Sequence, residues 1–202
     1  MLEKSMSIKG MITAIIFVTL GFTQVSLEIK NVDTDAGTLD IYMSNAAACS
    51  YCANSDYTDN AEDWAVQKGE CEDNDATWVA YDPITEEECS AIPSITGNGG
   101  WWFDGEVNAF QIQLPGVTVT GVSGGTAEAA GFLTVFSSST VLGFSITGAT
   151  IPVGSDVLLT QVTFTTFLGS SICFGEDTGS TGDNLISGST VNEDGEMVSL
   201  YV

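Results

Sequence analysis

The stretch EVNAFQIQLPGVTVTGV, residues 106–122, alternates apolar and polar side chains over most of its length. Phe110, Ile112 and Leu114 fall at every second position, and Val117 and Val119 resume this spacing after a Pro-Gly pair. A period of two is typical of a β-strand that buries one face, and Pro-Gly is typical of a turn. The stretch therefore predicts strand structure that is interrupted by a turn.

The same alternation continues along most of the chain from residue 24 onward. Further runs rich in Val, Ile, Thr and Phe occupy residues 24–32, 37–45, 131–148, 156–168, 172–175, 184–187 and 197–202. Gly, Pro and Ser interrupt these runs at short intervals, and the run at 131–148 resembles a hairpin with a serine turn. This pattern predicts an all-β protein, an antiparallel sandwich or barrel. We expect helix only at residues 124–132.

The composition excludes several classes of function. The 202 residues include 27 acids and four bases, all lysine, for a formal net charge of −23, and there is no arginine or histidine. Four lysines are too few to neutralise the phosphates of a nucleic acid. We therefore expect no nucleic-acid partner and no attraction to anionic lipid headgroups. The lack of histidine removes Ser-His-Asp catalysis and mixed Cys/His zinc sites. We expect a protein that is not an enzyme, although chemistry on two carboxylates remains possible.

The N-terminus has the order of a secretory signal peptide. Two lysines in residues 1–10 precede an uncharged apolar run at 11–22, which is too short to span a bilayer comfortably. We predict a signal peptide at 1–23 and a single mature domain at 24–202 that is secreted or lies at the cell surface. An uncleaved N-terminal anchor is the alternative. After cleavage we expect no membrane insertion.

Residues 46–105 break the alternation, and we interpret them as an insertion between two strands. Cys49, Cys52, Cys71 and Cys89 lie here, as do all four tryptophans. The C-x-x-C pair alone is compatible with zinc, redox chemistry or disulfides. Export to an oxidising compartment favours disulfides among the four, and three pairings remain open. We expect the fifth cysteine, Cys173, to be a buried thiol within a strand.

Residues 106–175 carry a pattern that resembles the cohesin-like domains of secreted bacterial surface proteins. The segments that carry it are VNAFQIQLPGVTVTGVSGGTAEAAGF, TVLGFSITGATIPVGSDVLLTQVTF and ICFGE, and VSLEIKNVDTDAGTLDIYMSN is similar to the first two strands of that family. The resemblance implies an antiparallel jelly-roll β-sandwich, which we expect to have about nine strands, with no catalytic activity. Cohesins bind dockerins through one sheet face. The insertion at 46–105, which we expect to be stapled by disulfides, is not part of that core.

Aromatic residues gather in the insertion and suggest a recognition surface. Flat rings beside carboxylates and amides suit stacking on sugars, although a small local core is the plainer interpretation. The candidate ligand-binding residues are Tyr57, Trp64, Trp78, Tyr81, Trp101 and Trp102. We expect one tryptophan of the pair at 101–102 to point inward and the other outward.

The only cofactor that the sequence suggests is calcium. The segment FGEDTGSTGDN, residues 174–184, is rich in turn residues and in oxygen ligands, and Glu176, Asp177 and Asp183 are the candidate metal ligands. A plain acidic turn is the alternative.

Together these patterns predict a secreted, non-catalytic cohesin-like module for extracellular protein binding, adhesion or surface assembly. Its partner would be a dockerin-like protein or another copy of the chain. The alternative is a carbohydrate-binding module that recognises polysaccharide through the insertion. A structural subunit of an extracellular fibre, with terminal strands that pair between copies, is a further alternative.

Overall fold

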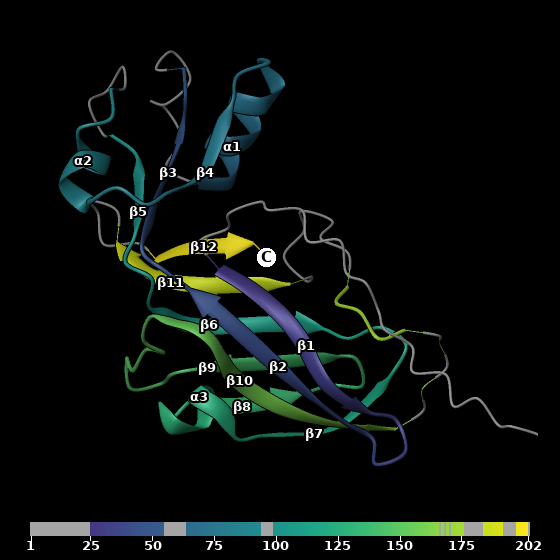
Figure 1. Ribbon diagram of the computed structural model, residues 1–202. Coiled ribbons are helices and arrows are strands. Elements are labelled where there is room, and N and C mark those ends of the chain that lie inside the picture. Colours follow the sequence, from purple (N-terminus) through teal and green to yellow (C-terminus); the bar gives the residue numbers. More distant parts are fainter. Residues whose placement is uncertain are drawn as a thin grey trace, which may run out of the picture.

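The structure is a computed structural model that describes residues 25–54, 64–93, 99–165, 167, 169, 171–175, 184–191 and 197–201. The segment at 1–23 predicted to be a signal peptide lies outside this range. Two large antiparallel sheets face each other, and a smaller third sheet stands at one end of them (Figure 1). The prediction of an all-β sandwich is confirmed.

The first large sheet has the strand order β1-β2-β10-β7. Its strands are β1 (Val25–Asp33), β2 (Thr38–Asn45), β10 (Gly154–Thr165) and β7 (Thr118–Ser123). The second has the order β12-β11-β6-β9-β8. Its strands are β12 (Met197–Tyr201), β11 (Leu185–Val191), β6 (Val107–Gln113), β9 (Thr140–Phe144) and β8 (Leu133–Phe136).

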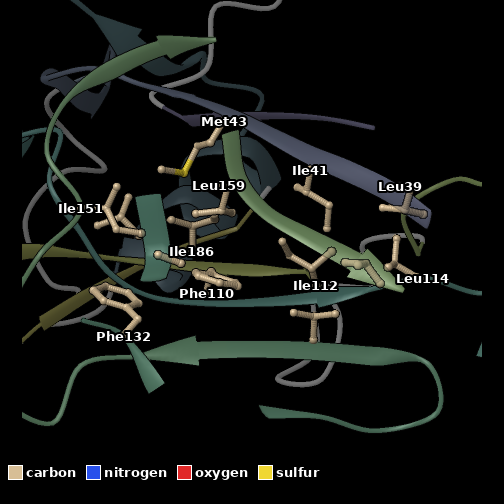
Figure 2. Packing of buried hydrophobic residues seen from close by; sticks show 14 of the residues in the cluster. Leu39, Ile41, Met43, Phe110, Ile112, Leu114, Phe132, Ile151, Leu159 and Ile186 are labelled. Carbon is tan, nitrogen blue, oxygen red and sulfur yellow. The ribbon is translucent and has the colours of Figure 1, made fainter. Parts of the chain in front are cut away.

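The hydrophobic core fills the space between these two sheets (Figure 2). The five side chains that the alternation at 106–122 singles out are all buried: Phe110, Ile112, Leu114, Val117 and Val119. From the facing sheet β2 contributes Leu39, Ile41 and Met43, and β10 contributes Leu159 and Val162. The period of two therefore identifies the buried residues of 106–122 correctly, whereas in β10 a register shift between Leu158 and Thr160 buries Leu159.

The hairpin predicted at 131–148 is present as β8 and β9. The turn between them is closed by a hydrogen bond from the backbone N–H of Ser137 to the carbonyl of Thr140, at 2.8 Å. Helix α3 (Gly125–Ala129) confirms the helical segment predicted at 124–132. The short strand predicted at 172–175 is absent, and this segment follows an irregular path.

The insertion is more regular than expected. It contains β3 (Ala48–Cys52), α1 (Trp64–Asp73), β4 (Trp78–Asp82), α2 (Glu86–Ser90) and β5 (Trp101–Phe103). The three strands form a sheet in the order β4-β3-β5. The expectation of helix at 124–132 alone is therefore wrong, because two helices lie in the insertion.

Asn45 anchors the insertion to the sandwich. It ends β2 immediately before the insertion, and its side chain is buried. The side-chain amide donates hydrogen bonds to the carbonyl of Gly105, at the end of the insertion, and to that of Pro152. The two ends of the insertion are thus held together by one buried side chain.

Candidate functional site

The C-x-x-C pair lies within a β-strand, and this decides its chemistry. Cys49 and Cys52 are three positions apart in β3, so their side chains leave opposite faces of the sheet. The sulfurs form two separate disulfides, Cys49–Cys89 and Cys52–Cys71, with Cα–Cα distances of 5.6 and 5.9 Å. The prediction of disulfides is confirmed. A zinc or redox site would need both sulfurs on the same side.

Each disulfide fastens one helix to one face of the small sheet. Cys71 lies in α1 and Cys89 lies in α2, so β3 is tied to a helix on either side. Gly100 leaves room for one of these bridges, because a Cβ atom there would lie 2.4 Å from the Sγ atom of Cys49 and 3.0 Å from that of Cys89. Any larger residue would displace the bridge.

Helix α2 begins with a capping box that our sequence reasoning missed. The Oγ1 atom of Thr85 accepts a hydrogen bond from the backbone N–H of Glu88 at 3.2 Å, and the Glu88 carboxylate accepts one from the backbone N–H of Thr85 at 2.9 Å. These hydrogen bonds hold the pKa of Glu88 below its ordinary value. The T-x-x-E spacing at 85–88 was the available signal.

The candidate aromatic residues do not share one face. Trp78 and Trp101 are half-buried and pack against the hydrophobic core, and the indole N–H of Trp101 donates to the buried side chain of Gln67 in α1. Trp102 follows Trp101 in β5 and therefore points to the opposite face, where it is also half-buried. The two tryptophans therefore lie on opposite faces of β5, and neither is fully exposed.

The remaining aromatic candidates differ in how far the structure describes them. Tyr81 is half-buried on β4. Tyr57 lies outside the described residues, and for Trp64 only the backbone, at the start of α1, is described. A further aromatic contact, which sequence reasoning did not single out, joins Tyr51 and Asp82 through a hydrogen bond of 2.9 Å. Burial of the phenol, together with this carboxylate, raises the pKa of Tyr51.

The calcium candidates Glu176, Asp177 and Asp183 lie outside the described residues. Within the ranges that the structure describes, no three or more His, Cys, Asp or Glu side chains gather in a way that could hold a metal ion. Calcium binding at 174–184 therefore stays a prediction.

The expectation of a buried thiol at position 173 is wrong, because Cys173 is exposed and unbridged. Its neighbours Ile172 and Phe174 pack against the core, so the residue between them points outward. Its sulfur lies 3.7 Å from the Ser171 hydroxyl.

A group of apolar side chains covers the outer surface of the hairpin formed by β8 and β9. Leu133 pairs with Phe144, and Val135 pairs with Leu142, so these four side chains lie on one side of the sheet. Leu133 is 49% exposed and Val135 is 42% exposed, while Leu142 and Phe144 are half-buried. We call these four residues the β8–β9 face.

The stretch of sequence that forms this face carries no charged residue. Of the 27 acidic residues only two, Glu128 and Asp156, lie between residues 107 and 175, and there is no charged residue at all in 129–155. Thirteen acids lie in the insertion at 46–105. Figure 1 shows the insertion at one end of the molecule and β8 toward the other. The chain therefore has an acidic region and a region without charge.

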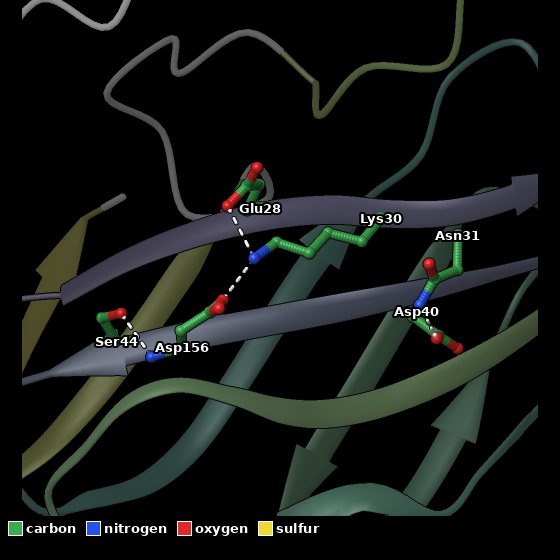
Figure 3. Close-up of polar contacts among 6 residues, drawn as sticks. All are labelled: Glu28, Lys30, Asn31, Asp40, Ser44 and Asp156. Carbon is green, nitrogen blue, oxygen red and sulfur yellow. Dashed lines mark hydrogen bonds and ion pairs between the residues drawn. The ribbon is translucent and has the colours of Figure 1, made fainter.

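The outer surface of the other large sheet is polar instead (Figure 3). Lys30 bridges the carboxylates of Glu28 and Asp156 and lies 4.7 Å from the centre of the Tyr42 ring. Its hydrogen bond to Asp156 is the largest cause of a raised pKa for the Lys30 ammonium. Asp40 accepts further hydrogen bonds from the side-chain amides of Asn31 and Gln161. Only the first of the two outer surfaces is therefore suited to apolar contact.

Comparison with protein families, with curated proteins and with solved structures gives no match to this chain. In the part of the chain that the structure describes, no helix has both the length and the apolar character needed to cross a membrane.

Proposed function

We propose that this protein is a secreted, non-catalytic, cohesin-like module that binds another protein through the β8–β9 face, in adhesion or surface assembly. The observation that carries the proposal is the contrast between the two outer sheet surfaces. One is covered by ion pairs and amide hydrogen bonds, whereas the other exposes Leu133 and Val135 with no charged residue in 129–155. Exposed apolar groups that cluster on a soluble protein mark interaction sites.

The strand order supports the jelly-roll form of the sandwich that the resemblance implies. The connections from β6 to β7, from β7 to β8, from β9 to β10 and from β10 to β11 each lead from one large sheet to the other. A chain that winds back and forth between two sheets in this way is typical of Greek-key sandwiches and jelly rolls. In the described part of the chain the two large sheets contain nine strands, which supports a sandwich core of about nine strands.

Extracellular location is supported by the two disulfides, which are typical of proteins from oxidising compartments. The uncharged apolar run at 11–22 provides the export signal in this proposal. No metal is needed for the binding that we propose, and calcium at 174–184 would act on local structure alone.

Carbohydrate binding by the insertion is the second candidate, and Trp102 is the residue that favours it. Its indole lies on the face of β5 opposite to that of Trp101, which packs against the core. A single stacking tryptophan predicts weak binding. Affinity electrophoresis in gels that contain polysaccharide tests this candidate, because Trp102→Ala should abolish any retardation. Retardation that Trp102→Ala leaves unchanged would contradict it.

A fibre subunit is the third candidate. Both β1 and β12 are edge strands of their sheets, as pairing between copies would require. Filaments seen by electron microscopy would favour it, and their absence across a range of salt and calcium concentrations would count against it.

The proposed function is tested by capture of proteins from a cell-surface extract on the immobilised, oxidised protein. Val135→Lys places a charge on the β8–β9 face, and the immobilised variant should no longer capture the protein. Val32→Lys is the matched control, because Val32 is 44% exposed, close to the 42% of Val135, and lies on β1. Capture that is unaffected by Val135→Lys would contradict the proposal, as would the absence of any captured protein.

A further inference from the structure

We infer that the partner is a second copy of this chain, with the β8 strands of two molecules pairing edge to edge, so that Leu133 and Val135, the exposed residues of the β8–β9 face, meet across the contact. This inference rests on the proposed function and names its partner. The pairing would join two five-stranded sheets into one continuous sheet across the dimer.

The edge of the sheet at β8 lacks three of the features that usually prevent such pairing. Edge strands are normally protected by charged side chains, prolines or bulges. β8 has the sequence LTVF, without a charge or a proline, and pairs with β9 without a register shift. Its outer edge pairs with no other strand in the described part of the chain.

An edge of the other large sheet, at β1, is protected by a bulge and by charged side chains. The register between β1 and β2 shifts between Lys30 and Asp33, and Asn31 within this bulge has a positive φ of 49°. β1 also carries the charged side chains of Glu28 and Lys30, and Lys30 reaches over the outer face of the sheet to Asp156 of β10 (Figure 3). The edge at β1 is thus protected against pairing with another chain, whereas β8 has no charge, proline or bulge that would prevent such pairing.

The distribution of charge favours a second copy over a basic partner. Two chains of formal charge −23 repel each other wherever their acidic surfaces meet, so they can approach closely only through a region without charge. Residues 129–155, which include β8 and β9, form such a region. A basic partner would find no opposite charge in this region and would bind the acidic surfaces instead. Because the described part of the insertion lies away from β8 (Figure 1), the acids on α1 and α2 of each copy would lie away from the dimer contact.

Two identical strands that pair antiparallel form an isologous contact with twofold symmetry, which closes the assembly at a dimer. A strand of four residues provides a small interface, so we expect a weak dimer that forms with rising protein concentration.

Sedimentation equilibrium of the oxidised full chain tests this inference, in a Cys173→Ser background so that no dimer can form through the exposed thiol. We expect a monomer–dimer equilibrium whose Kd falls by about threefold or more when salt rises from about 0.1 M to about 1 M, because screening weakens the repulsion between the chains. Binding of a basic partner to an acidic surface would weaken over the same range.

Charge swaps at position 135 make the test specific for β8. Val135→Lys and Val135→Glu should each raise Kd about tenfold or more, and an equal mixture of the two variants should restore the dimer, because opposite charges then face each other across the paired strands. Val32→Lys changes the net charge by the same amount as Val135→Lys and should leave Kd unchanged. Restoration by mixing cannot come from a misfolded variant. Hydrogen exchange of the unmutated chain should also show protection at 133–136 that increases with concentration.

Several results would overturn the inference. A monomer at every concentration and salt would do so, and capture of a different protein through the β8–β9 face would then still support the proposed function. A dimer that Val32→Lys disrupts and Val135→Lys does not would place the contact at β1. If the unmutated chain forms a dimer and the Cys173→Ser variant does not, the dimer is held together by a disulfide between the two copies.

Discussion

The sandwich and the insertion are held together in different ways. Between the two large sheets, side chains such as Phe110, Ile41 and Leu159 are buried almost completely. Within the insertion the fully buried apolar side chains are few, and the four half-cystines are prominent among them. A region with a large apolar core folds because of that core, whereas a small region with little apolar surface to bury needs cross-links.

The largest effect should come from the sandwich core. Phe110 is 1% exposed, and Phe110→Ala should lower the free energy of unfolding by about 3–5 kcal/mol, as measured by urea denaturation. Gly143 lies against this ring, since a Cβ atom there would lie 2.3 Å from the Cζ atom of Phe110. Gly143→Ala should therefore be destabilising in the unmutated chain and much less so beside Phe110→Ala. Equal effects in both backgrounds would show that the two residues do not touch.

Loss of either disulfide should affect the insertion alone. Each of the double variants Cys49→Ser/Cys89→Ser and Cys52→Ser/Cys71→Ser should remove about 3 kcal/mol of local stability. Hydrogen exchange should then accelerate in α2 for the first variant and in α1 for the second, while β2, β6 and β10 keep their protection. Accelerated exchange in those three strands would contradict the independence of the two regions.

The connection between the regions depends on Asn45. Asn45→Ala removes a buried hydrogen bond to the carbonyl of Gly105 and a part-buried one to that of Pro152, and should cost about 1–3 kcal/mol. The control is Asn74→Ala, because Asn74 makes an exposed hydrogen bond to the carbonyl of Glu70 and its loss should cost little. Equal effects of the two substitutions on thermal unfolding would show that Asn45 does not anchor the insertion.

The smallest effect should be at the start of α2. Thr85→Ala should destabilise this helix by about 1 kcal/mol at neutral pH, as measured by hydrogen exchange of α2. The pKa of Glu88 is lowered in the folded state, so its contribution is present above the ordinary carboxyl pKa and is lost as the pH falls through the lower, folded value. The difference between the variant and the unmutated chain should therefore shrink in acid. A difference that stays constant would exclude the Glu88 carboxylate from the cap.

Much of the sandwich could be predicted from the sequence because each strand buries one face. The spacing of Phe110, Ile112 and Leu114 identifies buried residues without knowledge of the strand order. The insertion could not be predicted in this way. Helix α1, with the sequence WAVQKGECED, has no continuous apolar face, and its position depends on the bridge from Cys71 to Cys52. Only three-dimensional structure tells which cysteine faces which helix.

The β8–β9 face was also missed, for a different reason. The run LTVF reads equally well as a strand buried on both faces, because apolar residues occur at both parities. Its exposure follows from its place at the edge of the sheet, which depends on pairings with residues that are distant in the sequence. The absence of charged residues from 129–155 was the signal that the sequence did contain.

The most direct test of the account is a hydrogen-exchange footprint of the protein bound to its partner, whether this is a second copy or another protein. Binding should slow exchange in residues 133–144, which include β8 and β9, and should leave exchange in the insertion unchanged. Protection confined to residues 46–105 would contradict it and would identify the acidic insertion as the recognition surface.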